Sequence, residues 1–145
     1  MRTLAPFAIL AVLLGLSGTV ISHGGIAPNN TVQQGCGVLG TAHVRTTLYF
    51  GLSHPNGIIS ESEWQNFLRT EVTPRFPNGF TVWEADGQWR KANGNIGKER
   101  AKVLLLVHEE SEAVRTDLAE IVEDYKHTYH QESVLWETAP VCASF

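Results

Sequence analysis

Two charged side chains, four residues apart, are the first candidates for chemistry in this sequence. Glu71 and Arg75 fall in the same stripe of a predicted helix as Trp64, Phe67 and Val72, and charges rarely enter an apolar stripe without a partner. Their i, i+4 spacing brings the two side chains together. Arg75 could bind a ligand carboxylate or phosphate while Glu71 orients it. Alternatively, a structural ion pair fixes the helix end to the sheet, and we favour this second interpretation.

Three further residues could contact a ligand. Trp89 and Arg90 are adjacent in a predicted hairpin, where an indole and a guanidinium can stack on a flat molecule, although packing at the hairpin edge explains the same pair. Tyr49 belongs to a predicted strand and points to the sheet face away from the helices. The candidate ligand-binding residues are therefore Tyr49, Glu71, Arg75, Trp89 and Arg90.

Histidines offer a weaker alternative. His54 follows the first predicted strand and His108 follows the third. We expect both at the same end of the sheet because we take these two strands as parallel neighbours. With Glu109 and Glu110 nearby, these histidines could bind a metal or act as a general base. Two histidines without a fixed third ligand do not support a metal site, so none is predicted.

Motifs for catalysis or cofactor binding are not found. The sequence has no glycine-rich phosphate loop, no nucleophile elbow and no Cys-x-x-Cys. The dipeptide Ser53-His54 is not a triad, because adjacent residues do not set a nucleophile against a base. With 15 acidic and 11 basic residues the net charge is −4, which leaves no electrostatic footprint for nucleic acid. We predict no catalytic residue, no cofactor and no nucleic-acid partner.

Residues 1–22 have the composition of a secretory signal peptide. Arg2 precedes an apolar run over residues 4–16, and small residues then lead to the polar stretch that begins at His23. The apolar run is short compared with the roughly 20 residues of a membrane span. We predict cleavage before His23, a periplasmic or secreted protein, and no stable membrane span after cleavage, with an uncleaved anchor as the alternative.

The two cysteines, Cys36 and Cys142, lie near opposite ends of the exported chain. In an oxidising compartment two cysteines favour one disulfide, and two buried thiols are the alternative. Residues 23–43 are rich in Gly, Pro, Asn and Gln, and we predict a flexible segment there, ordered only where Cys36 fixes it. The length of 145 residues suits one domain, which we place at residues 44–145.

Hydrophobic spacing predicts six elements in the order strand, helix, strand, strand, helix, strand. The strands are predicted over 46–52, 80–90, 102–107 and 133–137, and the helices over 60–74 and 111–129, with Pro74 ending or kinking the first. Ser60 and Glu63 form a capping box at its start. The order predicts a ferredoxin-like α+β fold, with a four-stranded antiparallel sheet and both helices on one face. Its first and third strands are central, and its fourth brings Cys142 close to Cys36.

The sheet face away from the helices is expected to be apolar. If Leu48, Phe50 and Leu52 face the helices, aromatic and aliphatic side chains line the other face in every register that the strands allow. A large exposed apolar patch marks a contact surface. We predict a homodimer through this open face. Covering by the second hairpin and a ligand platform are the alternatives.

Several segments carry a resemblance to a known family. They are residues 48–52 (LYFGL), 63–77 (EWQNFLRTEVTPRFP), 87–90 (GQWR), 102–108 (KVLLLVH) and 131–135 (QESVL). Together they resemble the DUF3574 family of uncharacterised bacterial exported proteins. The resemblance implies export, in agreement with residues 1–22, and implies no activity. Many relatives look like lipoproteins, but the lipoprotein box is missing before Cys36.

The sequence thus predicts an exported domain that self-associates and binds a small ligand or a cell-envelope component without catalysis. The alternative is a small cofactor-free enzyme similar to monooxygenase-like dimeric α+β barrels. Its pocket would lie near Tyr49, Arg75 and Trp89.

Overall fold

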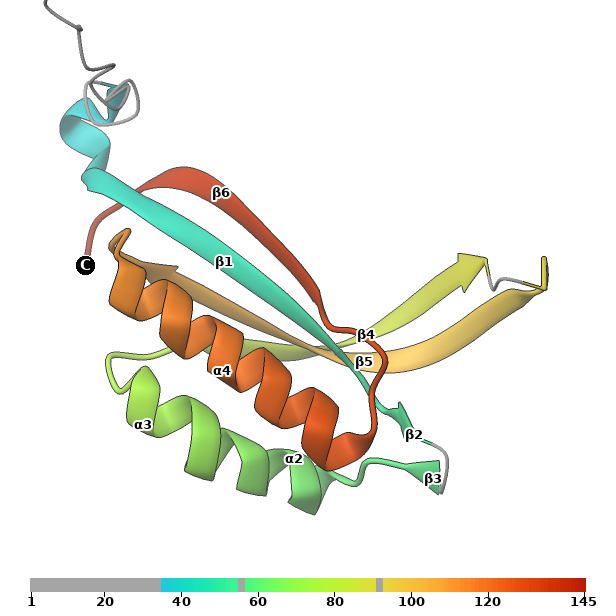
Figure 1. Ribbon diagram of the computed structural model, residues 1–145. Helices are drawn as coiled ribbons and strands as arrows, with labels where there is room; N and C mark the ends of the chain where they lie inside the picture. Colours follow the sequence, from blue (N-terminus) through green and yellow to red (C-terminus); the bar gives the residue numbers. More distant parts are fainter. Residues whose placement is uncertain (1–34, 55–56, 91–92) are drawn as a thin grey trace, which may run out of the picture.

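The computed structural model describes residues 35–54, 57–90 and 93–145 (Figure 1). Its elements are η1 (Gly37–Leu39), β1 (Thr41–Gly51), β2 (Ser53–His54), β3 (Gly57–Ile58), α2 (Glu61–Phe67), the π-helical η2 (Leu68–Val72), α3 (Thr73–Arg75), β4 (Thr81–Arg90), β5 (Ile96–His108), α4 (Glu112–Tyr129) and β6 (Leu135–Ala143). The predicted signal peptide, residues 1–22, and its cleavage before His23 lie outside the described residues. Among the helices described, none has the length and apolar character needed to cross a membrane.

One four-stranded sheet in the order β4-β5-β1-β6 carries both helical segments on one face (Figure 1). Every neighbouring pair of strands in it is antiparallel. The predicted ferredoxin-like α+β fold, with β1 and β5 central and β6 beside β1, is therefore confirmed.

The expectation that the first and third strands are parallel is wrong. The first helix returns the chain so that β4 runs in the direction of β1, and the β4–β5 hairpin then reverses it, which makes β5 antiparallel to β1. His108 therefore lies opposite Val44, at the start of β1, whereas His54 follows the end of β1. The two histidines stand at opposite ends of the sheet and cannot form one site.

Large side chains between the helices and one end of the sheet build the core. Leu48 and Phe50, two residues apart on β1, are fully buried on the helix side. The ring of Phe50 lies 4.6 Å from Tyr125, 5.3 Å from Trp64 and 5.9 Å from Phe67, measured between centroids. Such edge-on and tilted aromatic contacts add to the free energy gained from burial. The core therefore fixes both helices against the same stretch of β1.

The first helix passes through Pro74 instead of ending there. Ser60 and Glu63 form the predicted capping box at its start. The Thr73 N–H donates to the carbonyl of Leu68, five residues earlier. This π-turn inserts one residue and relieves the clash that a proline ring makes with the carbonyl four residues before it. The helix accordingly continues to Arg75.

A disulfide joins Cys36 to Cys142, with their Cα atoms 5.4 Å apart. Strand pairing explains the bridge, because Cys142 lies opposite Ala42 at the start of β1. The predicted pairing is confirmed. Of the segment 23–43, the structure describes residues 35–43, which contain Cys36, η1 and the start of β1 at Thr41.

The disulfide closes a loop with a sequence separation of 106 residues. Chain-entropy reasoning for a loop of this length gives about 4–5 kcal/mol of stabilisation. We expect the double variant Cys36→Ser, Cys142→Ser to lose about that much free energy of unfolding in urea. Dithiothreitol should destabilise the native protein to the same level and leave the double variant unchanged. Thiols that react in the folded, unreduced protein would contradict the bridge.

Candidate functional site

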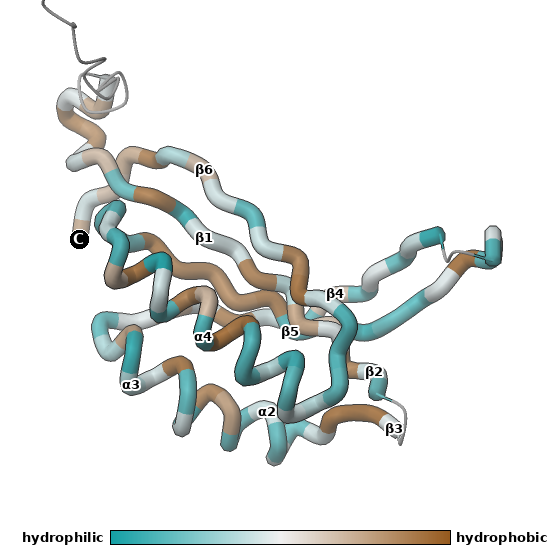
Figure 2. The backbone as a smooth tube through the Cα atoms, viewed as in Figure 1, coloured by the Kyte–Doolittle hydropathy of each residue, from teal (hydrophilic) through white to brown (hydrophobic). Residues whose placement is uncertain are grey.

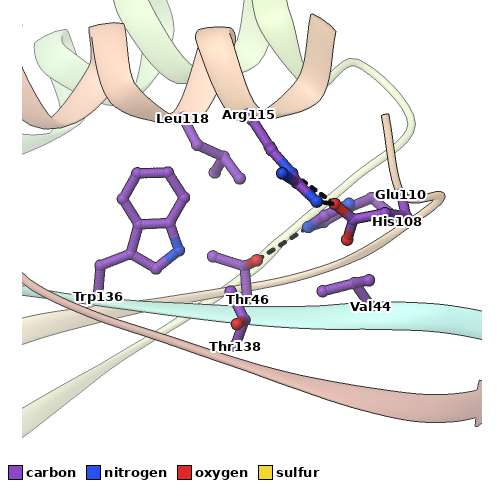
Figure 3. Close-up of a pocket in the computed structure, with 8 residues that line it drawn as sticks. All are labelled: Val44, Thr46, His108, Glu110, Arg115, Leu118, Trp136 and Thr138. Atoms are coloured by element: carbon purple, nitrogen blue, oxygen red, sulfur yellow. Dashed lines mark hydrogen bonds and ion pairs between the residues drawn. The ribbon is translucent and has the colours of Figure 1, made fainter. Parts of the chain in front are cut away.

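A cleft of about 530 Å³ lies where the start of α4 faces β1 and β6 (Figure 3). Its lining combines apolar, hydroxyl, imidazole and charged side chains: Val44, Thr46, His108, Glu110, Arg115, Leu118, Trp136 and Thr138. This volume falls within the range of small-molecule sites, which are mostly apolar with a few convergent polar groups. The cleft is therefore the candidate functional site.

The alternation of side chains along the strands determines which residues form the sheet side of the cleft. Val44 and Thr46 share the helix-facing side of β1 with Leu48, because side chains two residues apart point the same way. On β6, Thr138 lies opposite Thr46 and Trp136 lies opposite Leu48. The two edge residues of the cleft therefore follow from the same register that builds the core.

Helix α4 supplies the opposite wall. Ser111 caps the helix, since its hydroxyl accepts a hydrogen bond from the N–H of Val114 at 3.2 Å. The cap fixes where the helix begins, and hence where its first turns lie over the sheet. Arg115 and Leu118 are three residues apart on α4 and lie on the same side of it. One helix face thus presents a cation and an apolar side chain to the cleft.

A hydrogen-bond chain crosses the floor of the cleft. Thr46 Oγ1 lies 2.9 Å from His108 Nε2 (Figure 3). His108 Nδ1 lies 2.8 Å from the carbonyl oxygen of Glu109. A carbonyl oxygen only accepts, so Nδ1 carries the proton, and Nε2 of the neutral ring accepts from the Thr46 hydroxyl. Both ring nitrogens are engaged, and Thr46 is fully buried. The chain therefore orients His108, and the Thr46 hydroxyl in it is buried away from solvent.

The two ends of the cleft differ in character. At one end Arg115 donates to the carboxylate of Glu110, and at the other Trp136 stands beside Leu118 (Figure 3). The side chains of Arg115 and Glu110 are 62% and 49% exposed, so water screens their attraction and the pair contributes little to stability. The cleft thus joins a loosely held ion pair to an apolar end.

Arg75 lies elsewhere, at the junction between α3 and α4. Its Nη1 donates to the carbonyl and carboxylate oxygens of Glu71 at 2.8 and 3.0 Å, and its Nη2 to Glu120 and Asp124 at 3.1 and 3.2 Å. Both terminal nitrogens are engaged, and three surrounding carboxylates oppose the approach of another anion. Arg75 joins the first helix to α4, whereas the predicted structural pair was expected to reach the sheet.

The pKa values of two carboxylates around Arg75, those of Glu71 and Asp124, are shifted in opposite directions. The hydrogen bond from Arg75 lowers the pKa of Glu71. Burial, followed by the charge of Glu71, raises the pKa of Asp124. Since the negative charge of Glu71 is stabilised and that of Asp124 is not, Glu71 is the main partner of Arg75.

The remaining predicted residues do not join Arg75. Tyr49 lies on the open face, where its hydroxyl donates to Glu137 at 3.3 Å. Trp89 and Arg90 end β4, far along the hairpin arm that extends beyond the helices (Figure 1), and Arg90 donates to the carbonyl of Gly94. The structure therefore does not bring Tyr49, Arg75 and Trp89 together, and the cleft found in the described residues is lined by none of them.

Comparison with known proteins identifies the family of this chain. A family profile described as "Protein of unknown function (DUF3574)" matches residues 45–145. The chain belongs to the DUF3574 family. The resemblance read from the sequence is thus confirmed, and no curated protein matches this DUF3574 chain.

Solved structures share the fold of this DUF3574 protein. A phage SAM lyase in complex with S-methyl-5'-thioadenosine has a TM-score of 0.53 and 11% identity, covering 70% of this chain and 90% of the lyase. CutA from Synechococcus elongatus PCC7942, complexed with Bis-Tris, has a TM-score of 0.49 and 15% identity, covering 73% and 87%. At 11% identity the likeness to the lyase shows the fold alone.

Most of the cleft escaped the reasoning from sequence. His108 and Glu110 were considered as part of a histidine site, whereas Thr46, Arg115 and Trp136 were not. One signal was present: Thr46 continues the buried alternation of Leu48 toward the start of β1, and a polar side chain at a buried position needs a partner.

Replacing Arg75 should test its structural role. We expect Arg75→Gln to lower the free energy of unfolding by about 2 kcal/mol at neutral pH, since hydrogen bonds to charged groups are lost. Arg69→Gln is the matched control, because Arg69 is exposed on the same helical segment and donates only to Asn66.

The cost of Arg75→Gln should depend on pH. Glu71 has a lowered pKa in the folded state, so its stabilising contribution is present above its ordinary pKa and is lost as the pH falls through the folded value. Asp124 has a raised pKa, so its effect on stability changes with pH in the opposite direction and offsets part of the loss from Glu71. Urea unfolding should show the cost shrinking below about pH 4. A folded variant of unchanged stability at neutral pH would contradict the structural role.

Proposed function

We propose that this DUF3574 protein is an exported binding domain that self-associates through its open sheet face and holds a small ligand in the cleft without catalysis. The disulfide supports export, because such bridges persist in oxidising compartments. The signal-peptide composition of residues 1–22 supports it as well. The two binding surfaces are argued separately below.

The alternation along β4 supports self-association. Trp83, Ala85 and Trp89 fall on the open face, while Glu84 and Asp86 fall on the helix side, with an unbroken β4–β5 register. Every β4 residue after Ala85 is exposed, and the arm extends beyond the helices (Figure 1). Burial within the chain therefore does not explain why the aromatic residues share one face. A partner on that face explains it.

An apolar row crosses the whole open face. The register aligns Trp83 with Val103, Val103 with Tyr49, and Tyr49 with Leu135, one residue from each strand. Val103 is fully buried between its neighbours, while Trp83 and Leu135 are 42% and 61% exposed. Figure 2 shows apolar stretches on the strands as well as on the helices. A contiguous row of this kind is typical of a protein contact surface.

A second copy of the chain fits this surface. The open face carries Arg45 on β1 and Glu137 on β6, two charges of opposite sign, and also Glu99 on β5, which accepts a hydrogen bond from the N–H of Ser53. A two-fold interface is self-complementary, so each contact between two different residues occurs twice. When the open faces of two copies pack together, Arg45 of each copy can therefore pair with Glu137 of the other. Such pairing satisfies the requirement that buried charges be paired.

Trp83→Glu should abolish self-association. A carboxylate at the β4 end of the apolar row would be buried in the interface without a paired cation, which is unfavourable. Light scattering should give twice the chain mass for the native protein and the single-chain mass for the variant, whose circular dichroism spectrum should still be that of the folded protein. Ile58→Glu is the control, because Ile58 is 64% exposed on β3, outside the row. A native protein that stays monomeric at high concentration would contradict the interface.

The cleft supports binding of a small ligand. Its polar groups converge on a volume that suits a small molecule, and the Thr46 hydroxyl bonded to His108 is buried, so it is not placed to attack a ligand. The cofactor-free enzyme alternative required a pocket near Tyr49, Arg75 and Trp89, and no observation in the described residues favours it. Binding without catalysis is therefore the function that the geometry supports best.

A thermal-shift screen with a blocked variant tests this binding function. Thr138 is exposed at the edge of the cleft, so Thr138→Trp should fill the cleft without disturbing the core. A ligand of the cleft should raise the melting temperature of the native protein and have no effect on Thr138→Trp. Thr128→Trp, at an exposed position of α4 outside the cleft lining, is the control and should respond like the native protein. If the ligand raises the melting temperature of Thr138→Trp as much as that of the native protein, the ligand binds outside the cleft.

A further inference from the structure

The charged end of the cleft carries one cation and one anion that hold each other. Arg115 donates through Nε and Nη2 to a single carboxylate oxygen of Glu110, and both side chains are about half exposed or more. Because such a pair contributes little, a ligand can replace either partner at small cost. A simple carboxylate would displace Glu110 and place two anions together, while a simple amine would leave Arg115 without its anion. A zwitterion satisfies both.

The apolar end lies within reach of this pair. Arg115 and Leu118 are i, i+3 neighbours on α4, with Cβ atoms about 5–6 Å apart on such a spacing. Trp136 packs beside the buried Leu118 and is itself partly exposed at this end of the cleft (Figure 3). An amino acid bound at the ion pair therefore has the apolar end of the cleft beside it.

We propose that the ligand of the cleft is a free α-amino acid with an apolar side chain; this proposal rests on the cleft being the ligand site. The ligand carboxylate takes the guanidinium of Arg115, for which two parallel N–H donors are well suited. The ligand ammonium takes Glu110. The ligand side chain lies against Trp136, which is partly exposed. Two ion pairs thus replace one, with no charge left unpaired.

Three probes that share one apolar group test the proposal by calorimetry: L-phenylalanine, 3-phenylpropanoate and 2-phenylethylamine. L-leucine, with 4-methylpentanoate and 3-methylbutylamine, forms a second series of smaller size. The amino acid of at least one series should bind at least ten times more tightly than its deaminated and decarboxylated analogues.

Variants of the ion pair provide a reciprocal test. Arg115→Gln should weaken amino-acid binding at least ten-fold. Glu110→Gln should weaken it as well, yet strengthen binding of the deaminated acid, because the competing carboxylate is gone. Lys126→Gln is the matched control, since it removes an exposed pair with Glu123 on the same helix, outside the cleft, and should change nothing.

The outcomes separate this proposal from the broader one. If the deaminated acid binds as tightly as the amino acid and Thr138→Trp abolishes both, the zwitterion proposal falls while the cleft remains a ligand site. Amino-acid binding that survives Thr138→Trp also overturns it. If neither series binds and the screen finds no ligand sensitive to Thr138→Trp, both proposals fall.

Discussion

A gradient of side-chain size along the helix-facing side of β1 determines where this protein is solid and where it is open. Phe50 and Leu48 are large and fully buried, and Phe50 contacts aromatic rings of both helices. The hydroxyl of Tyr125 donates to the carbonyl of Gly51 at 2.8 Å and fastens α4 to that end of the strand. Toward the start of β1 the side chains become small, with Thr46 and then Val44. Less volume is filled there beneath α4, and the cleft opens at that place.

Cations of this fold fall into two kinds. Arg75 is held by three carboxylates from two helices, and the buried Lys102 by Glu61 at 2.6 Å and Glu84 at 2.9 Å. Burial lowers the pKa of Lys102, but the hydrogen bonds to Glu61 and Glu84 together raise it by more than burial lowers it. The pKa of Lys102 is therefore raised overall, and the side chain stays charged. Each of these cations joins separate elements. Arg115 has one exposed partner, five residues away in sequence, and joins no distant element. This contrast separates cations that hold elements of the fold together from cations such as Arg115 and Lys126, whose partners lie nearby in sequence.

The sequence predicted the fold more fully than the site, for a physical reason. Alternation along β1 and the capping box at Ser60 are local, and both were readable from neighbouring residues. The cysteine pair followed because the element order alone brings Cys142 to the start of β1. The cleft needs Thr46, His108, Arg115 and Trp136 to converge from four elements, and its size depends on how far apart packed elements stand. Periodicity reports which way a side chain points but not that separation. The direction of β5 was misjudged although the element order contained it, and the misplaced histidine pair followed from that error.

Both proposed binding surfaces depend on the same strand. Thr46 and Val44 face the cleft, whereas Arg45 and Tyr49 face the open side. A shift of one residue in the register of β1 would exchange the two sets and bury the wrong one. Leu48 and Phe50 prevent the shift, because exposing them to water would lose most of the core. Since the two surfaces lie on opposite faces of the sheet, a second copy on the open face leaves the cleft accessible. Self-association and ligand binding are therefore compatible in one molecule, and the buried alternation of β1 maintains both.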